Sequence, residues 1–420
     1  MLVLSRWMLV AAPQNAGQAM DFFRSRAMNM RKRQGLDSWH VDPSANRDLD
    51  FLDGVRGVAI LMVVACHLVY LNPQAGPVTR FLRGVLDGGG QGVTVFFALS
   101  GFLISWPFWK RIAKGAPHVV PTGYGWRRFW KIYPPLALTV VVLGALYFVT
   151  TRDPGYLGVA MQWLAGLPVA LPITGKLNSV MWSLVVEVQF YCILPLVFLL
   201  VRRIRPRTAV WVLFGAFLVL PSALRYWGMA RGAYFTVEPI VATHCLFWFD
   251  AFACGILVAG LESTGRLPKG LARYAWLGFV ILAFAVTLTP WLEFKQVGSE
   301  SLRGELRIWL VKLASGLLLC YVADPERAPA RLLAAPCLRW CGLISYEWYL
   351  FHWPIILAAR IGFGPANGNL LKYALIVGGS LCLSLALAAG VYRWFSMPLL
   401  RHGRSAHSAK PHPRPVMSPA

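Results

Sequence analysis

The sequence predicts an all-α protein, a polytopic bundle of about ten transmembrane helices with both termini in the cytoplasm. Of its 420 residues, 57% are hydrophobic and 14% are charged, whereas about a quarter of the residues in an average soluble protein are charged. Apolar runs long enough to cross a bilayer recur along the chain. Lys and Arg, 41 against 18 acidic residues, gather between alternate pairs of these runs, as they do in cytoplasmic loops.

The individual spans follow from length. Crossing a hydrocarbon core about 30 Å thick takes about 20 apolar residues in a helix. The segments that satisfy this requirement are 54–72, 91–109, 132–150, 179–201, 208–224, 239–261, 273–292, 306–323, 340–360 and 371–396. An eleventh candidate, 157–173, is short and is interrupted by Gly166, Pro168 and Pro172.

The charge distribution favours ten spans. With ten, 29 of the 41 Lys and Arg residues fall in segments that would face the cytoplasm. Counting 157–173 as a span would place the basic run 202–207 outside and would invert every later loop, against the positive-inside rule. We therefore expect 157–173 to be re-entrant or interfacial on the outer face of a multi-pass protein of the inner (plasma) membrane.

The chain is expected to form one membrane domain, residues 51–397, between a poorly ordered cytoplasmic arm, 1–50, and a disordered cytoplasmic tail, 398–420. Its formal charge of +23 has three common causes, which are nucleic-acid binding, anionic lipid and membrane topology. No stretch without apolar runs is long enough for a basic nucleic-acid-binding domain. The sequence therefore predicts the lipid bilayer as a partner and excludes nucleic acid.

Ionisable residues inside the predicted spans are functional candidates, because they are costly at membrane depth unless paired or hydrated. Arg56 and His67 are eleven residues apart, almost three helical turns and about 16 Å, so both face the same way. A histidine at mid-membrane suits a general base that takes the proton of an attacking hydroxyl. The alternative is a histidine satisfied by the backbone of a neighbouring helix.

Glu187 lies in the outer half of its predicted span, and Ser183, Glu187 and Tyr191 share one helix face. Its carboxylate suits three roles, which are binding a polar substrate, orienting His67, and pairing with a basic group on another helix. Lys312 is one candidate for that basic partner.

Polar residues also crowd the segment 345–352. Glu347 and His352 are five residues apart, about 140° around a helix, so they do not face each other, and either can line a cavity. His352 has a second interpretation, because Pro354 leaves a carbonyl without a partner one turn earlier, which a buried histidine can cap.

Two further groups have both a functional and a structural interpretation. Ser100 and Gly101 form a small pair at mid-helix, which close helix packing also explains. Arg127, Arg128 and Lys131 stand at the predicted cytoplasmic mouth, where they suit phosphate groups or act only as a positive-inside anchor. No set of residues has the spacing of a metal site, so we expect no metal.

Five stretches together carry a resemblance to a known family. In chain order they are LDFLDGVRGVAILMVVACH, in which Arg56 and His67 form an Arg-x10-His pair, VTVFFALSGFLIS, RRFWKIYPP, WSLVVEVQFYCILP and ISYEWYLFHWP. They extend over about residues 50–400. In this combination the chain resembles the acyltransferase-3 family of integral membrane O-acyltransferases.

The resemblance implies transfer of an acyl group, usually acetyl, from cytoplasmic acyl-CoA to a hydroxyl of a cell-surface or lipid-linked carbohydrate. Acyl-CoA is then a co-substrate, and no cofactor is bound permanently. The implied catalytic residues are His67, as base or acyl carrier, Arg56 and Glu187. The implied binding residues are Arg127, Arg128 and Lys131 for the phosphates of CoA, and Ser100, Tyr346, Glu347 and His352 for the acceptor.

The chain departs from the family pattern at two positions. Lys131 stands where a second Arg is usual, which keeps a point charge but not a bidentate donor. Glu347 stands where a small polar residue is more usual, which bears on the acceptor or the acyl group. Many relatives also carry a C-terminal periplasmic esterase-like domain, which we expect this chain to lack, so that a separate esterase-like or glycan-synthesis partner would supply any second step.

A different class of protein also fits these residues. A transporter that moves a lipid-linked glycan or acyl carrier without chemistry also places His, Glu and Asp inside its spans. Such a transporter commonly contains an inverted repeat, and we detect none in the sequence.

Overall fold

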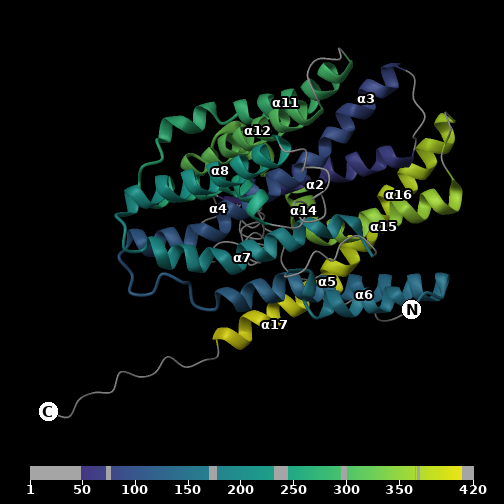
Figure 1. The fold of residues 1–420 in the computed structure, drawn as a ribbon, viewed down its shortest axis with the longest axis horizontal. Coiled ribbons are helices and arrows are strands. Elements are labelled where there is room, and N and C mark those ends of the chain that lie inside the picture. Colours follow the sequence, from purple (N-terminus) through teal and green to yellow (C-terminus); the bar gives the residue numbers. More distant parts are fainter. Residues whose placement is uncertain are drawn as a thin grey trace, which may run out of the picture. The chain divides into compact units, whose positions relative to one another are not determined.

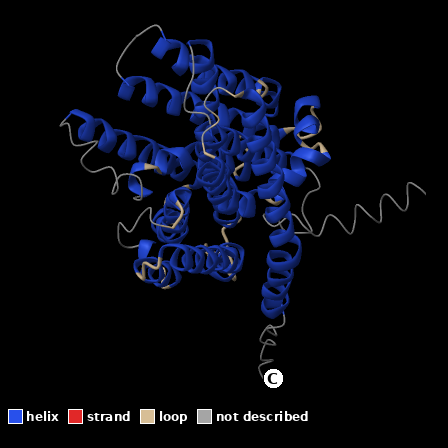
Figure 2. Cartoon of the chain, turned by 90° about the vertical axis from the view of Figure 1, so that its right-hand side faces the viewer, coloured by secondary structure: helices blue, strands red, loops and turns tan. Residues whose placement is uncertain are grey.

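A computed structural model describes residues 49–71, 77–169, 177–230, 245–294, 300–364, 366 and 369–408. Every regular element in these ranges is a helix (Figures 1 and 2), as expected for a chain whose backbone must satisfy its own hydrogen bonds within lipid. The predicted N-terminal arm, 1–50, lies almost wholly outside the described residues.

The helices confirm a polytopic bundle. Within the described ranges, seven helical stretches are long and apolar enough to cross a membrane. They are 50–71, 83–113, 124–151, 179–201, 206–227, 303–323 and 371–403. The helix over 277–292 is apolar but shorter. The number ten and the cytoplasmic position of both termini stay predictions.

Two of the predicted spans differ from the helices observed. Part of 239–261 lies outside the described residues, and α10 (Phe249–Ser263) has 15 residues. The predicted span 340–360 is divided at Ile344, which separates α14 (Pro336–Leu343) from α15 (Ser345–Phe363).

Two central helices, α2 (Asp50–Leu68) and α4 (Gly92–Ala113), approach their neighbours through glycines. A Cβ atom at Gly57 of α2 would lie 2.1 Å from the carbonyl oxygen of Leu338 on α14. Likewise, a Cβ atom at Gly101 of α4 would lie 2.3 Å from the carbonyl oxygen of Phe252 on α10. Small residues thus allow backbone-to-backbone packing, as is usual for membrane helices.

A helix that was not predicted, α3 (Pro77–Asp87), lies between the first two spans and packs against α11 (Leu277–Phe294). Its eleven residues, PVTRFLRGVLD, mix apolar and basic side chains. They are too few and too polar to meet the criterion for a span, which is why the search for apolar runs did not find them.

The segment around 157–173 contains α6 (Gly155–Leu164), whose 10 residues extend about 15 Å. This is too short to cross a bilayer. Helix α6 packs against α5 (Tyr124–Thr151), and Tyr133 Oη donates a hydrogen bond of 2.9 Å to the carbonyl oxygen of Leu164. Because Tyr133 lies in the first half of α5, α6 turns back along α5. The re-entrant or interfacial position of this segment stays a prediction.

The helical end of the chain extends further than predicted. Helix α16 (Leu370–Val391) continues through a π-helical turn, Tyr392–Ser396, into α17 (Met397–Ser408). Trp126 Nε1 on α5 donates a hydrogen bond of 2.8 Å to the carbonyl oxygen of Gly403 on α17. The segment expected to be a disordered tail, 398–420, therefore begins as a helix packed on α5, and 409–420 lie outside the described residues.

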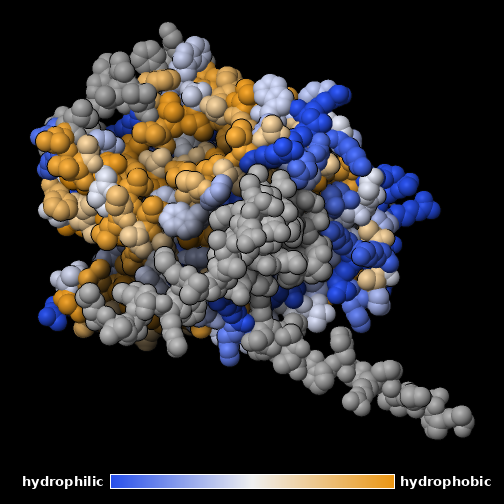
Figure 3. All heavy atoms as spheres, turned by 180° about the vertical axis from the view of Figure 1, so that it is seen from behind, coloured by the Kyte–Doolittle hydropathy of each residue, from blue (hydrophilic) through white to orange (hydrophobic). Residues whose placement is uncertain are grey.

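The surface of the bundle is suited to lipid. Figure 3 shows a face on which apolar residues form a broad patch, while hydrophilic residues gather along one edge. Large apolar side chains are exposed on several helices, among them Leu196, Leu200, Val219, Ile361, Leu375 and Leu383. In water such a surface would be a liability, but in a bilayer it is the expected exterior of a multi-pass protein.

Candidate functional site

The structure places His67 directly against His352. Nδ1 of His67 lies 3.0 Å from Nε2 of His352, and the two rings have centroids 4.9 Å apart. His352 is completely buried, whereas His67 is half-buried. Trp353 covers another side of the pair, with its ring 5.0 Å from that of His67. We refer to His67 and His352 as the histidine pair.

The backbone holds both rings. Nδ1 of His67 lies 2.9 Å from the carbonyl oxygen of Val63, one turn earlier on α2. Nδ1 of His352 lies 3.0 Å from the carbonyl oxygen of Trp348, one turn earlier on α15.

His352 does not cap the carbonyl that Pro354 leaves free. That oxygen belongs to Leu350, and it accepts a hydrogen bond of 2.9 Å from Asn178 Nδ2. Asn178 is buried just before α7 (Trp182–Val201). The capping interpretation of His352 is therefore wrong, and its ring is available to His67.

A second group, which we call the charged cluster, consists of Arg56, Arg128, Lys131 and Glu187. The charges of Glu187 and Arg128 act on Arg56, and the charges of Arg56, Arg128 and Glu187 act on Lys131. The cluster thus joins α2, α5 and α7, and it lies toward the start of α2, whereas the histidine pair lies toward its end.

Hydroxyl groups hold Glu187 in place. Ser100 Oγ on α4 donates a hydrogen bond of 2.7 Å to Oε1 of Glu187, and the hydroxyl of Tyr191 donates a second to the same oxygen. The predicted helix face that Glu187 and Tyr191 share is confirmed by this contact. The packing interpretation holds for Gly101, which approaches the backbone of α10. The role of Ser100 in acceptor binding stays a prediction.

Arg128 is held by aromatic rings. Its guanidinium lies 5.5 Å from the ring centroid of Tyr191 and 6.0 Å from that of Tyr124, within the usual range of cation–π contacts. Its Nε is buried, and no described residue accepts a hydrogen bond from it. A cavity of about 280 Å³ between α5 and α7 opens beside it, with a lining that is otherwise mainly apolar.

The remaining predicted residues lie around these two groups. Arg56 forms an ion pair of 3.0 Å with Asp53. Arg127 is exposed and donates to the carbonyl oxygen of Thr122 in the preceding loop. Tyr346 Oη donates a hydrogen bond of 2.8 Å to the carbonyl oxygen of Ile132, and the buried Glu347 is within electrostatic reach of Lys131.

Sequence reasoning missed several neighbours of the site. Asp53, three residues before Arg56, carried a usable signal, because this spacing places both on one helix face. Tyr349 was among the polar residues expected in 345–352, but its contacts were not: its ring centroid is 5.8 Å from that of His352, and its hydroxyl lies 2.7 Å from that of Ser183. Asp87, the last residue of α3, acts electrostatically on His67. It carried no signal, because the helix that positions it was not predicted.

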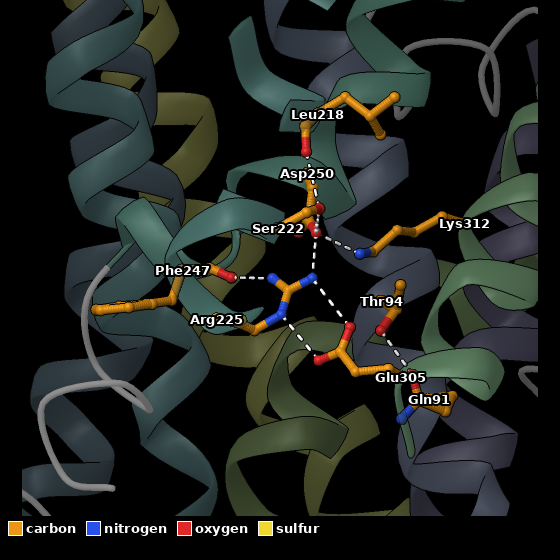
Figure 4. A network of polar contacts seen from close by, with 9 residues as sticks. All are labelled: Gln91, Thr94, Leu218, Ser222, Arg225, Phe247, Asp250, Glu305 and Lys312. Atoms are coloured by element: carbon orange, nitrogen blue, oxygen red, sulfur yellow. Dashed lines mark hydrogen bonds and ion pairs between the residues drawn. The ribbon is translucent and has the colours of Figure 1, made fainter. Parts of the chain in front are cut away.

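A separate set of buried charges, the ion network, joins α8 (Pro206–Ala230), α10 and α12 (Glu300–Leu319). As Figure 4 shows, Arg225 and Lys312 both donate to Oδ2 of Asp250, and Arg225 also binds Glu305 at 3.0 Å. Lys312 therefore pairs with Asp250, and the alternative that it neutralises Glu187 is wrong.

Comparison with known proteins decides the family. The model of the acyltransferase-3 family, described as an acyltransferase domain, matches residues 49–389. The chain belongs to the acyltransferase-3 family. The match includes the histidine pair, the charged cluster and the ion network. No solved structure matches the chain.

Individual relatives of this family member agree with the assignment. The O-acetyltransferase OatA of Staphylococcus aureus is 24% identical over 392 residues, which cover 87% of this chain and 59% of OatA. The acyltransferase MdmB of Streptomyces mycarofaciens is 32% identical, covering 81% of this chain and 87% of MdmB. The putative membrane-bound transacylase BcsY of Komagataeibacter xylinus is 26% identical, covering 78% of each chain. The chain thus spans about six tenths of the length of OatA.

Proposed function

We propose that this protein is an O-acyltransferase of the inner membrane that moves an acyl group, in the simplest case acetyl, from cytoplasmic acyl-CoA to a hydroxyl of a cell-surface or lipid-linked carbohydrate. The observation that carries the proposal is the arrangement along α2. Near the end of α2, the half-buried His67 contacts a second histidine, His352. Near its start lies the charged cluster, in which the buried Nε of Arg128 has no hydrogen-bond acceptor among the described residues.

The charged cluster suits the phosphates of the donor. Arg56, Arg128 and Lys131 supply three basic side chains within electrostatic reach of one another. Hydrogen bonds between charged donors and phosphate are among the strongest in proteins. The buried Nε of Arg128 is a donor for which a bound anion would provide the acceptor. The apolar cavity beside Arg128 suits the uncharged part of the donor.

The histidine pair suits the chemical step. His67 takes the proton of the acceptor hydroxyl as that oxygen attacks the thioester carbonyl. The new C–O bond forms, the C–S bond breaks, and His67 returns the proton to the departing thiolate. The products are an O-acylated carbohydrate and CoA, and no other reactant is required.

The test uses the purified full chain in lipid vesicles, supplied with labelled acetyl-CoA and candidate lipid-linked glycans. We expect His67→Ala to lower acetyl transfer by about 10²- to 10⁴-fold, the usual contribution of a general base. The matched control is His118→Ala, which changes an exposed histidine in the loop between α4 and α5. A wild-type protein that moves a glycan across the vesicle, without transfer or hydrolysis of acetyl-CoA, would be a transporter and would refute the proposal.

A further inference from the structure

The hydrogen bonds of the histidine pair fix the protonation of both rings. A backbone carbonyl can only accept, so Nδ1 of His352, 3.0 Å from the carbonyl oxygen of Trp348, carries a hydrogen. In a neutral ring, Nε2 of His352 is then an acceptor. Nδ1 of His67 faces this acceptor at 3.0 Å and the carbonyl oxygen of Val63 at 2.9 Å. It therefore carries a hydrogen as well, which it shares between them.

This assignment leaves Nε2 of His67 with its lone pair. Among the described residues, no group forms a hydrogen bond with that nitrogen, and the side chain is only half-buried. His352, in contrast, has no exposed surface at all. Of the two histidines, only His67 keeps surface that another molecule can touch.

We propose that His352 is a positioning residue, which orients the ring of His67 and accepts its Nδ1 hydrogen so that Nε2 is presented to the acceptor hydroxyl. This inference rests on the proposed function for its role in the reaction. It replaces the role in acceptor binding that the family resemblance implies for His352. When His67 takes up a proton, its positive charge is shared through Nδ1 with a neutral acceptor that the Trp348 carbonyl holds in place.

The surroundings of the pair are consistent with this role. The titratable groups that face it are Asp87 at the end of α3, which acts electrostatically on His67, and Tyr349 on α15, whose ring packs against His352. Cys66, next to His67 on α2, points its thiol toward Asp87, with 3.8 Å between Sγ and Oδ1. Asp87 stands beside His67 but does not form the hydrogen bond to Nδ1, which His352 and Val63 occupy.

The kinetic test compares His352→Phe, which fills the space but removes the acceptor, with His352→Gln, whose side-chain oxygen can still accept from His67. We expect His352→Phe to lower kcat about 100-fold, the scale of a misplaced reacting group, with the KM for the acceptor within threefold of wild type. The kcat of His352→Gln should be at least tenfold higher than that of His352→Phe. Trp353→Phe, which keeps an aromatic ring against His67, controls for packing alone. A rise in acceptor KM with unchanged kcat, or equal losses in His352→Phe and His352→Gln, would overturn the proposal.

A second measurement does not depend on activity. In protein labelled with ¹⁵N-histidine, the signals lost in His352→Phe identify His352. We expect hydrogen on Nδ1 and a bare Nε2, and the loss of an acceptor in His352→Phe should shift the Nδ1 signal of His67. The opposite tautomer of His352, or an unchanged His67 signal, would refute the pairing. If wild-type protein transfers no acyl group while these signals are as expected, the proposed function fails and the pairing stands.

Discussion

The ion network and the charged cluster both bury charged side chains among apolar helices, but they satisfy those charges differently. In the ion network each of the four charged groups has an oppositely charged partner within 4 Å, in the pairs Arg225–Asp250, Arg225–Glu305 and Lys312–Asp250. In the charged cluster, Arg128 lies over tyrosine rings with a buried donor that no described residue binds.

Under the proposed function, this difference separates charges that hold helices together from charges that bind a ligand. In the ion network every charge has an opposite partner, and the one atom of its ion pairs without a hydrogen bond among the described residues, Asp250 Oδ1, is an acceptor, so the network offers nothing to a further anion. A cationic donor without an acceptor costs free energy until an anion is bound. We therefore expect substitutions in the ion network to affect folding and substitutions in the charged cluster to affect substrate binding.

The largest effect is expected from Asp250→Ala, because it leaves Arg225 and Lys312 buried without their shared carboxylate. The free energy of unfolding should fall by about 3–5 kcal/mol, as is typical when one partner of a buried ion pair is removed. Thermal unfolding in detergent provides the measurement. Asp324→Ala, which breaks an exposed pair with Arg327, is the control and should cost about 0–1 kcal/mol. Normal stability together with lost acyl transfer would place the ion network in the functional site.

A change of Arg128→Gln should raise the KM for acyl-CoA by roughly 10- to 150-fold, since charge-assisted hydrogen bonds contribute about 1.5–3 kcal/mol. Stability should change little, because Nε of Arg128 has no partner among the described residues. Steady-state kinetics with each substrate varied in turn provides the measurement, and the exposed Arg203→Gln is the control. An equal rise in the KM for the acceptor would argue against a donor site.

Ser100→Ala should lower kcat/KM about tenfold, because Glu187 loses one hydrogen bond to a charged acceptor, worth about 1.5 kcal/mol. The same rate measurement on Ser105→Ala is the matched control. Ser105 is buried on the same helix, but its hydroxyl bonds only the carbonyl oxygens of Gly101 and Phe102 within α4. If the two variants have equal activity, Glu187 does not depend on Ser100.

The smallest effect is expected from Tyr346→Phe, which removes a neutral hydrogen bond to the carbonyl oxygen of Ile132. The free energy of unfolding should fall by about 1 kcal/mol, with the KM of either substrate unchanged. Unfolding and kinetic measurements on the same preparation distinguish this outcome from the acceptor-binding role that the family resemblance implies, which would appear as a higher acceptor KM.

Contacts within one helix could be predicted from the sequence. The shared face of Glu187 and Tyr191 follows from helical spacing, and the structure confirms it through their hydrogen bond. That Glu347 and His352 do not face each other also follows from helical spacing, and the structure agrees, because Glu347 is within electrostatic reach of Lys131 while His352 contacts His67. Apolar runs of sufficient length also predicted the bundle itself.

Contacts between helices could not be predicted. His67 and His352 are 285 positions apart, and Lys312 and Asp250 are 62 apart. In a membrane protein both the lipid-facing and the inward-facing sides of a helix are apolar, so hydropathy does not indicate which faces meet. The sequence therefore identified most of the polar residues of the site but not which of them are partners.

The glycine contact between α2 and α14 has a consequence for the choice of donor. Because the two backbones touch at Gly57, α2 has no room to slide or tilt on that side. Arg56 and His67, both on α2, therefore keep a fixed separation of about 16 Å along the helix axis. Under the proposed function, an acyl carrier with that length between its anionic end and its reactive carbon would engage both residues at once, and a shorter activated acyl compound would engage only one of them.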